Sequence, residues 1–99
     1  MTTKREFSEN FRRQFDEWNY RWNIERNKLE AKAQRAESNV KKEIREQIEG
    51  IRERRDRVKE KLGQIDVATE NAWEDLKEGA EKSWKDLVEA FKTATSRFK

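Results

Sequence analysis

Residues 73–98 read WEDLKEGAEKSWKDLVEAFKTATSRF, and in this stretch large apolar side chains return every eleven residues. Trp73 and Trp84 are separated by this interval, and two leucines three residues further on keep the same spacing. Eleven residues complete three helical turns at about 3.67 residues per turn, so these side chains lie along one stripe. Lys, Glu and Asp occupy most of the other positions. The pattern predicts an amphipathic helix over residues 71–98.

The same interval of eleven runs through almost the whole chain. Thr3 and Glu6 have the spacing of a capping box, which predicts that a helix begins at the N-terminus. Counted in steps of eleven residues, eight successive positions are apolar. They are Phe7, Trp18, Leu29, Val40, Ile51, Leu62, Trp73 and Trp84.

Composition favours an elongated helical protein over a conventional globular domain. Of the 99 residues 45% are charged and 32% are hydrophobic, and the net charge is only +3. There is no proline and there are only three glycines, so little interrupts the good helix formers. We expect one all-α unit, with a long charged helix over 3–62, a joint over 63–70 and the amphipathic helix over 71–98. Gly63 and Asn71 are among the poorer helix formers that mark the joint.

Two arrangements of these helices remain open. In a helical hairpin, the C-terminal helix folds back over residues 40–62 and leaves the N-terminal aromatics free for another chain. In an antiparallel coiled coil of two chains, Phe7 aligns with Phe98 and Trp22 with Trp84. The second arrangement brings the arginine-rich middle of both chains together, where like charges repel. The hairpin is therefore favoured.

The residue types that are missing argue against catalysis. The chain has no cysteine and no histidine, which removes thiol chemistry, the commonest general base and the commonest transition-metal ligand. No glycine-rich phosphate loop is present. We therefore expect a non-enzymatic protein with no cofactor and no metal site. The first residues do not resemble a signal peptide and no stretch is apolar enough to span a membrane, so we expect a cytoplasmic protein.

A basic run over residues 52–61 raises the question of nucleic acid. Clustered Lys and Arg release counterions from phosphates, and this is the usual basis of such binding. Glu53, Asp56 and Glu60 are interleaved with the basic residues at distances that allow pairing within the helix. We interpret the run as a solvated, paired surface, and nucleic acid is not the expected partner.

The aromatic stripes at the two ends of the chain are the predicted binding surface. They are expected to bind a protein partner or a second copy of the chain. The alternative is a peripheral membrane protein that lays the same stripes on a lipid surface, since basic residues flank the N-terminal one. The candidate partner-binding residues are Phe7, Phe11, Phe15, Trp18, Trp22, Trp73, Leu76, Trp84, Leu87, Phe91 and Phe98.

The segment AWEDLKEGAEKSW over residues 72–84 resembles the tails of small bacterial coiled-coil proteins of uncharacterised function. The likeness is closest over residues 69–99. The eleven-residue rhythm is also similar to the amphipathic repeats of exchangeable apolipoproteins. These resemblances imply a cytoplasmic helical binder, an accessory subunit or a lipid-associating protein. They supply no ligand or catalytic residue.

Overall fold

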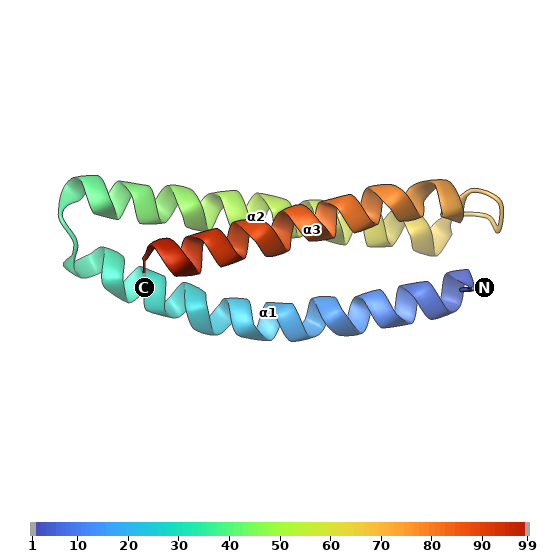
Figure 1. Cartoon of the computed structure of the whole chain (residues 1–99), viewed down its shortest axis with the longest axis horizontal. Coiled ribbons are helices and arrows are strands. Elements are labelled where there is room, and N and C mark those ends of the chain that lie inside the picture. The colour runs from blue at the N-terminus through green and yellow to red at the C-terminus, as the bar shows by residue number, and fades with distance from the viewer. Residues whose placement is uncertain (1, 99) are drawn as a thin grey trace.

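The computed structural model describes residues 2–98, which form three long α-helices. These are α1 (Lys4–Arg35), α2 (Ser38–Val67) and α3 (Trp73–Arg97). The chain runs up, down and up again, so that α1 and α3 are parallel and α2 is antiparallel to both (Figure 1). The bundle measures 52 × 19 × 18 Å. The prediction of an elongated, all-α fold is confirmed, and no strand occurs within the described residues.

The start of α1 follows the predicted cap. The Thr3 side chain accepts a hydrogen bond from the backbone N–H of Glu6 at 3.1 Å. This contact satisfies one of the donors that the first turn of a helix leaves without a partner.

The long helix predicted over 3–62 is wrong in one respect, because the chain turns back at Ala36 and Glu37. Both residues have extended backbone, with ψ angles of 158° and 159°. The backbone N–H of Ala36 closes the end of α1 on the carbonyl of Ala33 at 3.2 Å. No glycine or proline marks this turn, so local sequence gave no signal for it. The turn lets α1 fold against α2, and the two helices then share a core that neither could build alone.

The joint lies later than the predicted range of 63–70. Helix α2 continues through Gly63 to Val67, and the loop occupies residues 68–72. The N-cap of α3 is Ala72, and no side chain caps this helix. Instead the Thr69 carbonyl accepts hydrogen bonds from the N–H groups of Ala72 and Trp73, both at 3.1 Å.

The core is divided by residue type among the helices. Side chains from α2 are aliphatic, and the largest side chains of α1 and α3 are aromatic. Aliphatic residues pack flat between close helices, whereas rings of this size hold two helices further apart. The buried members of α2 are Ile44, Ile48, Ile51, Val58, Leu62 and Ile65.

A polar cluster fixes α1 against the end of α2. Lys4 Nζ donates to the carbonyl oxygens of Asp66 and Ala68 at 2.9 and 2.7 Å, which satisfies acceptors at the C-terminus of α2. Ser8 Oγ donates to the Asp66 carboxylate at 2.8 Å, and Arg12 forms an ion pair with the same carboxylate. Lys4, Ser8 and Arg12 are four residues apart, so one face of α1 makes all these contacts. The cluster sets the register between the two helices.

The turn between α1 and α2 generates a stability prediction. Glu37 is the N-cap of α2, but its side chain makes no capping hydrogen bond. Aspartate is a preferred N-cap residue because its shorter carboxylate reaches the first N–H groups of the helix. We expect Glu37→Asp to raise the free energy of unfolding by about 0.5–1 kcal/mol, measured by urea denaturation.

Glu17→Asp is the matched control, because Glu17 is exposed in the interior of α1. There the same change should lower stability slightly, since aspartate is the poorer helix former. Equal effects of the two substitutions would contradict the cap assignment.

Candidate functional site

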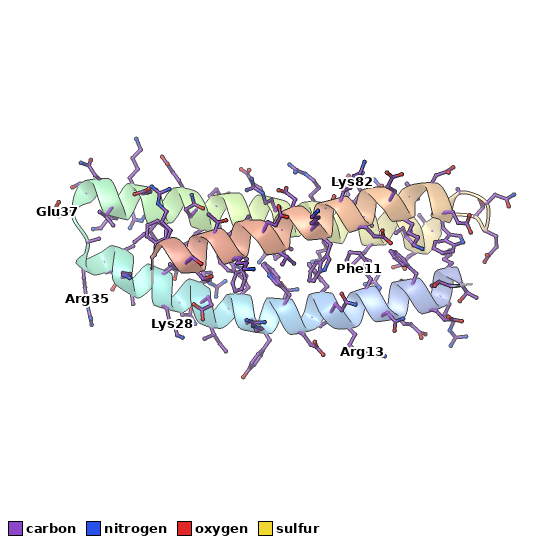
Figure 2. The ribbon with its side chains drawn as sticks, viewed as in Figure 1. Phe11, Arg13, Lys28, Arg35, Glu37 and Lys82 are labelled. Carbon is purple, nitrogen blue, oxygen red and sulfur yellow. The ribbon has the colours of Figure 1, made fainter. Side chains whose placement is uncertain are left out.

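Helices α1 and α3 meet through aromatic rings rather than through close backbone contact. Their backbones approach each other at far fewer places than either approaches α2. The ring centroids of Phe11 and Trp84 are 5.6 Å apart, and those of Trp18 and Phe91 are 5.5 Å apart. Figure 2 shows Phe11 directed from α1 into the space between the helices. We call this contact the aromatic seam; it consists of Phe7, Phe11, Phe15, Trp18, Trp22, Trp73, Trp84 and Phe91.

The rings of α1 form a stack that the rings of α3 meet edge-on. Phe15, Trp18 and Trp22 follow at helical spacing, with nearly parallel planes at 15° and 11° to one another. Trp84 crosses Phe15 and Trp18 at 64° and 76°. Edge-to-face and offset-stacked pairs are the favourable geometries for aromatic rings, and each contributes about 0.5–1.5 kcal/mol beyond its buried area. The seam is therefore a defined cluster of ring contacts.

The structure brings the eleven predicted binding residues together inside one chain. The sequence analysis placed them in stripes at opposite ends and left the N-terminal stripe free for another chain. In the folded chain the N-terminal rings are not free, because α1 and α3 cover each other. Trp22 contacts Phe91 of the same chain at 6.1 Å. Seven of the eleven are buried, namely Phe11, Phe15, Trp18, Trp22, Trp73, Leu87 and Phe91, and Phe7, Leu76, Trp84 and Phe98 are half-buried.

Two indole groups in the seam lack hydrogen-bond partners. The Nε1 atoms of Trp18 and Trp22 are buried, and neither finds an acceptor among residues 2–98. A buried donor without an acceptor costs about 1–3 kcal/mol, and such groups are uncommon in folded proteins. The seam is consequently less stable than a purely hydrocarbon core of the same size. Sequence reasoning could not find this feature, because it depends on where each indole nitrogen points.

Charged side chains close the seam at both ends. Lys77 Nζ lies 5.6 Å from the ring centroid of Phe7 and 5.9 Å from that of Trp73, within the range of a cation–π interaction. At the opposite end, Lys32 of α1 donates a hydrogen bond to the backbone carbonyl of Phe98. The Lys32 contact joins α1 to α3, and Lys77 lies over the boundary between the two helices. The Lys32 contact is exposed to solvent, where such contacts are weak, and Lys77 is half-buried.

The basic run pairs both within α2 and with α3. Arg54 Nε lies 3.1 Å from an Asp86 carboxylate oxygen, and Arg57 Nη1 lies 3.9 Å from the same atom. Arg54 also donates to the Gly50 carbonyl at 3.0 Å. As expected, other arginines of the run pair within their own helix, Arg52 with Glu49 and Arg55 with Asp56. The run therefore helps to attach α3 to α2.

Two further apolar side chains of α1 face solvent. Tyr20 is 71% exposed and Ile24 is 42% exposed. Their position four residues apart puts them on one side of the helix, away from the seam.

Within residues 2–98 no helix combines the length and apolarity needed to cross a membrane. The same residues hold no group of three carboxylates placed to bind a metal ion. Comparison with protein-family models, with curated proteins and with solved structures finds no match to this chain.

The unpartnered indoles generate a prediction about the core. Trp22→Ala should lower the free energy of unfolding by about 3–5 kcal/mol, as expected for a fully buried ring. Trp22→Phe should cost less than about 1.5 kcal/mol, because it removes the unpaired N–H together with part of the ring. Urea denaturation of both variants measures these values.

Trp73→Phe is the control, because Trp73 is similarly buried but its indole nitrogen is not among the buried unpartnered atoms. Trp73→Phe should destabilise by about 1 kcal/mol more than Trp22→Phe, since no unpaired donor is removed. If Trp22→Phe is the more damaging change, the indole N–H of Trp22 has a partner in the native protein.

Proposed function

We propose that this chain is a non-enzymatic interaction protein that binds a protein partner, or a second copy of itself, through the aromatic seam. The observation that carries the proposal is the pair of buried indole N–H groups of Trp18 and Trp22 without acceptors. A partner that supplied acceptors would recover the free energy that the closed bundle loses there. Tryptophan is enriched at protein interfaces because its body is apolar and its N–H is polar.

The arrangement of polar contacts favours opening at this seam. Helix α2 holds α1 through the Asp66 cluster, and it holds α3 through Arg54–Asp86 and an ion pair between Glu43 and Arg97. Helices α1 and α3 contact each other through aromatic rings and through the end contacts of Lys77 and Lys32. Separation of α1 from α3 therefore leaves each helix attached to α2. The half-buried ring of Trp84 gives a partner its first apolar contact.

The residue types of the chain agree with a binding role. Without histidine or cysteine, the chain lacks the side chains most often used as catalytic bases and nucleophiles. We propose an accessory subunit that works in the cytoplasm, which is what the resemblance suggested for residues 72–84 implies.

A membrane surface is the second candidate for the same seam. The indole ring suits the boundary between headgroups and acyl chains, where its N–H finds acceptors and its body finds hydrocarbon. Lys77 lies over the seam rings of Phe7 and Trp73 and would meet anionic headgroups. This candidate uses the same opening of α1 from α3.

Photocrosslinking in cells that express the natural protein tests the proposal. In one variant a photoreactive phenylalanine analogue replaces Trp84 in the seam. In the control variant it replaces Arg13, which points away from the other helices (Figure 2). We expect adducts to a protein, or to a second copy, from position 84 and none from position 13. The adduct partner is then purified, and its affinity for the chain should fall with Trp22→Phe although the fold is retained.

Three outcomes decide between the candidates. Adducts of equal yield from both positions, or none from position 84, contradict seam binding. Adducts to lipid alone, together with co-sedimentation with anionic vesicles, favour the membrane surface. Circular dichroism of each labelled variant confirms that the bundle is still helical.

A further inference from the structure

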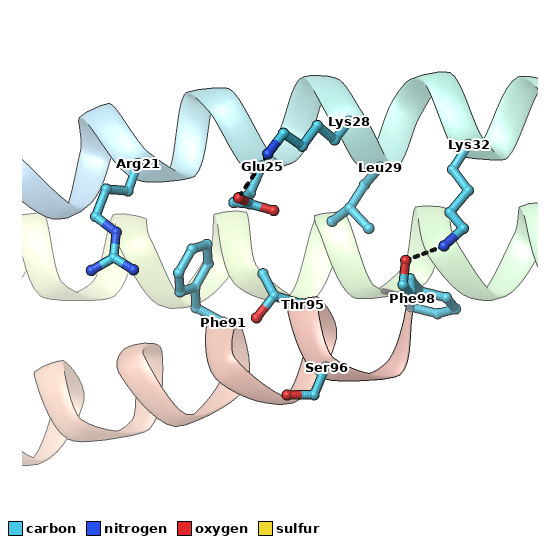
Figure 3. Close-up of a pocket in the computed structure, with 9 residues that line it drawn as sticks. All are labelled: Arg21, Glu25, Lys28, Leu29, Lys32, Phe91, Thr95, Ser96 and Phe98. Atoms are coloured by element: carbon cyan, nitrogen blue, oxygen red, sulfur yellow. Dashed lines mark hydrogen bonds and ion pairs between the residues drawn. The ribbon is translucent and has the colours of Figure 1, made fainter.

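A groove lies between α1 and α3 near the C-terminal ends of both helices (Figure 3). Its volume is about 470 Å³, within the range of about 300–1,000 Å³ that is usual for small-molecule sites. The groove is present in the closed bundle and does not require the seam to open. It shares Phe91 with the aromatic seam, but binding in it does not require the opening proposed above.

The floor of the groove is apolar. Leu29 and Phe91 form its buried part, and Phe98 is a half-buried wall at the far end. These side chains come from both helices and lie in one line along the groove. A floor of this kind favours a hydrocarbon chain over a polar ligand, because burying the chain removes apolar surface from water.

The rim of the groove carries three basic side chains and one carboxylate, that of Glu25, and these charges differ in what they already bind. Lys28 lies 3.5 Å from the Glu25 carboxylate, and Lys32 donates to the Phe98 carbonyl. Arg21 has no ion pair with any acidic side chain among residues 2–98. Figure 3 shows its guanidinium extending from α1 toward α3 beside Phe91. Arg21 is thus the cation that an added anion can use.

We propose that this groove binds a single-chain anionic amphiphile, with the anionic head on Arg21 and the alkyl chain along Phe91, Leu29 and Phe98. The planar guanidinium matches a carboxylate or a phosphate through two parallel hydrogen bonds. From Arg21 to Lys32 the groove follows eleven residues of helix, about 16 Å, which suits an extended alkyl chain.

The orientation follows from the electrostatics of the two ends. The last carbonyl groups of α3 carry partial negative charge at the Phe98 end, where an anion is disfavoured. Lys32 already satisfies one of these carbonyls. The head therefore lies at the Arg21 end, and the chain points toward Phe98.

The test uses dodecanoate, kept below its micelle concentration, added to the ¹⁵N-labelled full chain. We expect saturable one-to-one shifts of backbone amide signals that are largest around residues 21, 29 and 95. Arg21→Gln should weaken binding about ten-fold, the factor expected for loss of a charge-assisted hydrogen bond. Arg13→Gln removes the same charge from the outer side of α1 and should bind dodecanoate like the unmodified protein.

Further ligands separate the contribution of the head from that of the chain. Dodecyl phosphate should compete with dodecanoate for the groove, since the two share an anionic head and an alkyl chain. Dodecanol, acetate and inorganic phosphate each lack one of these parts and should bind at least about ten-fold more weakly.

Several results would overturn the proposal. The first two are equal affinity for dodecanol and dodecanoate, and equal loss of dodecanoate affinity in the Arg21 and Arg13 variants. The others are binding to anionic vesicles without binding of the monomeric amphiphile, and unfolding without saturable shifts in the groove. A ligand-bound groove together with an absence of seam crosslinks would leave this proposal standing and remove only the proposed function.

Discussion

The spacing between α1 and α3 depends on one set of contacts, the edge-to-face packing of Phe91 and Trp84 against the stacked rings of α1. Phe91 lies against Trp18 and Trp22 with centroids at 5.5 and 6.1 Å. Rings of this size hold the two backbones apart, while the aliphatic side chains of α2 allow it to pack closely. The asymmetry of the bundle follows from this difference. Two boundaries are close and reinforced by ion pairs, and the third is filled by rings.

Most of the helical content could be predicted from the sequence, because the eleven-residue repeat is a direct consequence of helix geometry. The repeat identified Trp18, Trp73 and Trp84 as members of one apolar system. It could not identify what would cover them. A stripe of this kind packs equally well on another chain or on its own chain, and the pattern contains no information that separates the two.

The turn at Ala36 and Glu37 explains why the prediction of a single long helix failed. Neither residue has the special backbone geometry that glycine or proline supplies, since both adopt ordinary extended angles. Helix α2 begins without a side-chain cap. The turn is therefore stabilised by tertiary packing of α1 on α2, which a local reading of propensity does not include. The predicted joint before α3 lies closer to the observed loop, because several weak helix formers cluster there.

Seam residues that contact each other are far apart in the sequence, and this separation also constrains how the protein folds. Phe7 contacts Trp73 and Trp18 contacts Phe91, so each pair joins residues from the first and the last helix. Each helix hairpin, in contrast, closes around a short turn of a few residues. Contacts between distant residues carry a larger loop-closure entropy and tend to form after local ones. We therefore expect the two hairpins to assemble first and the rings of α1 and α3 to meet last. By the same logic the rings separate first when the bundle loosens, and the chain then exposes its aromatic interior while both hairpins are still intact.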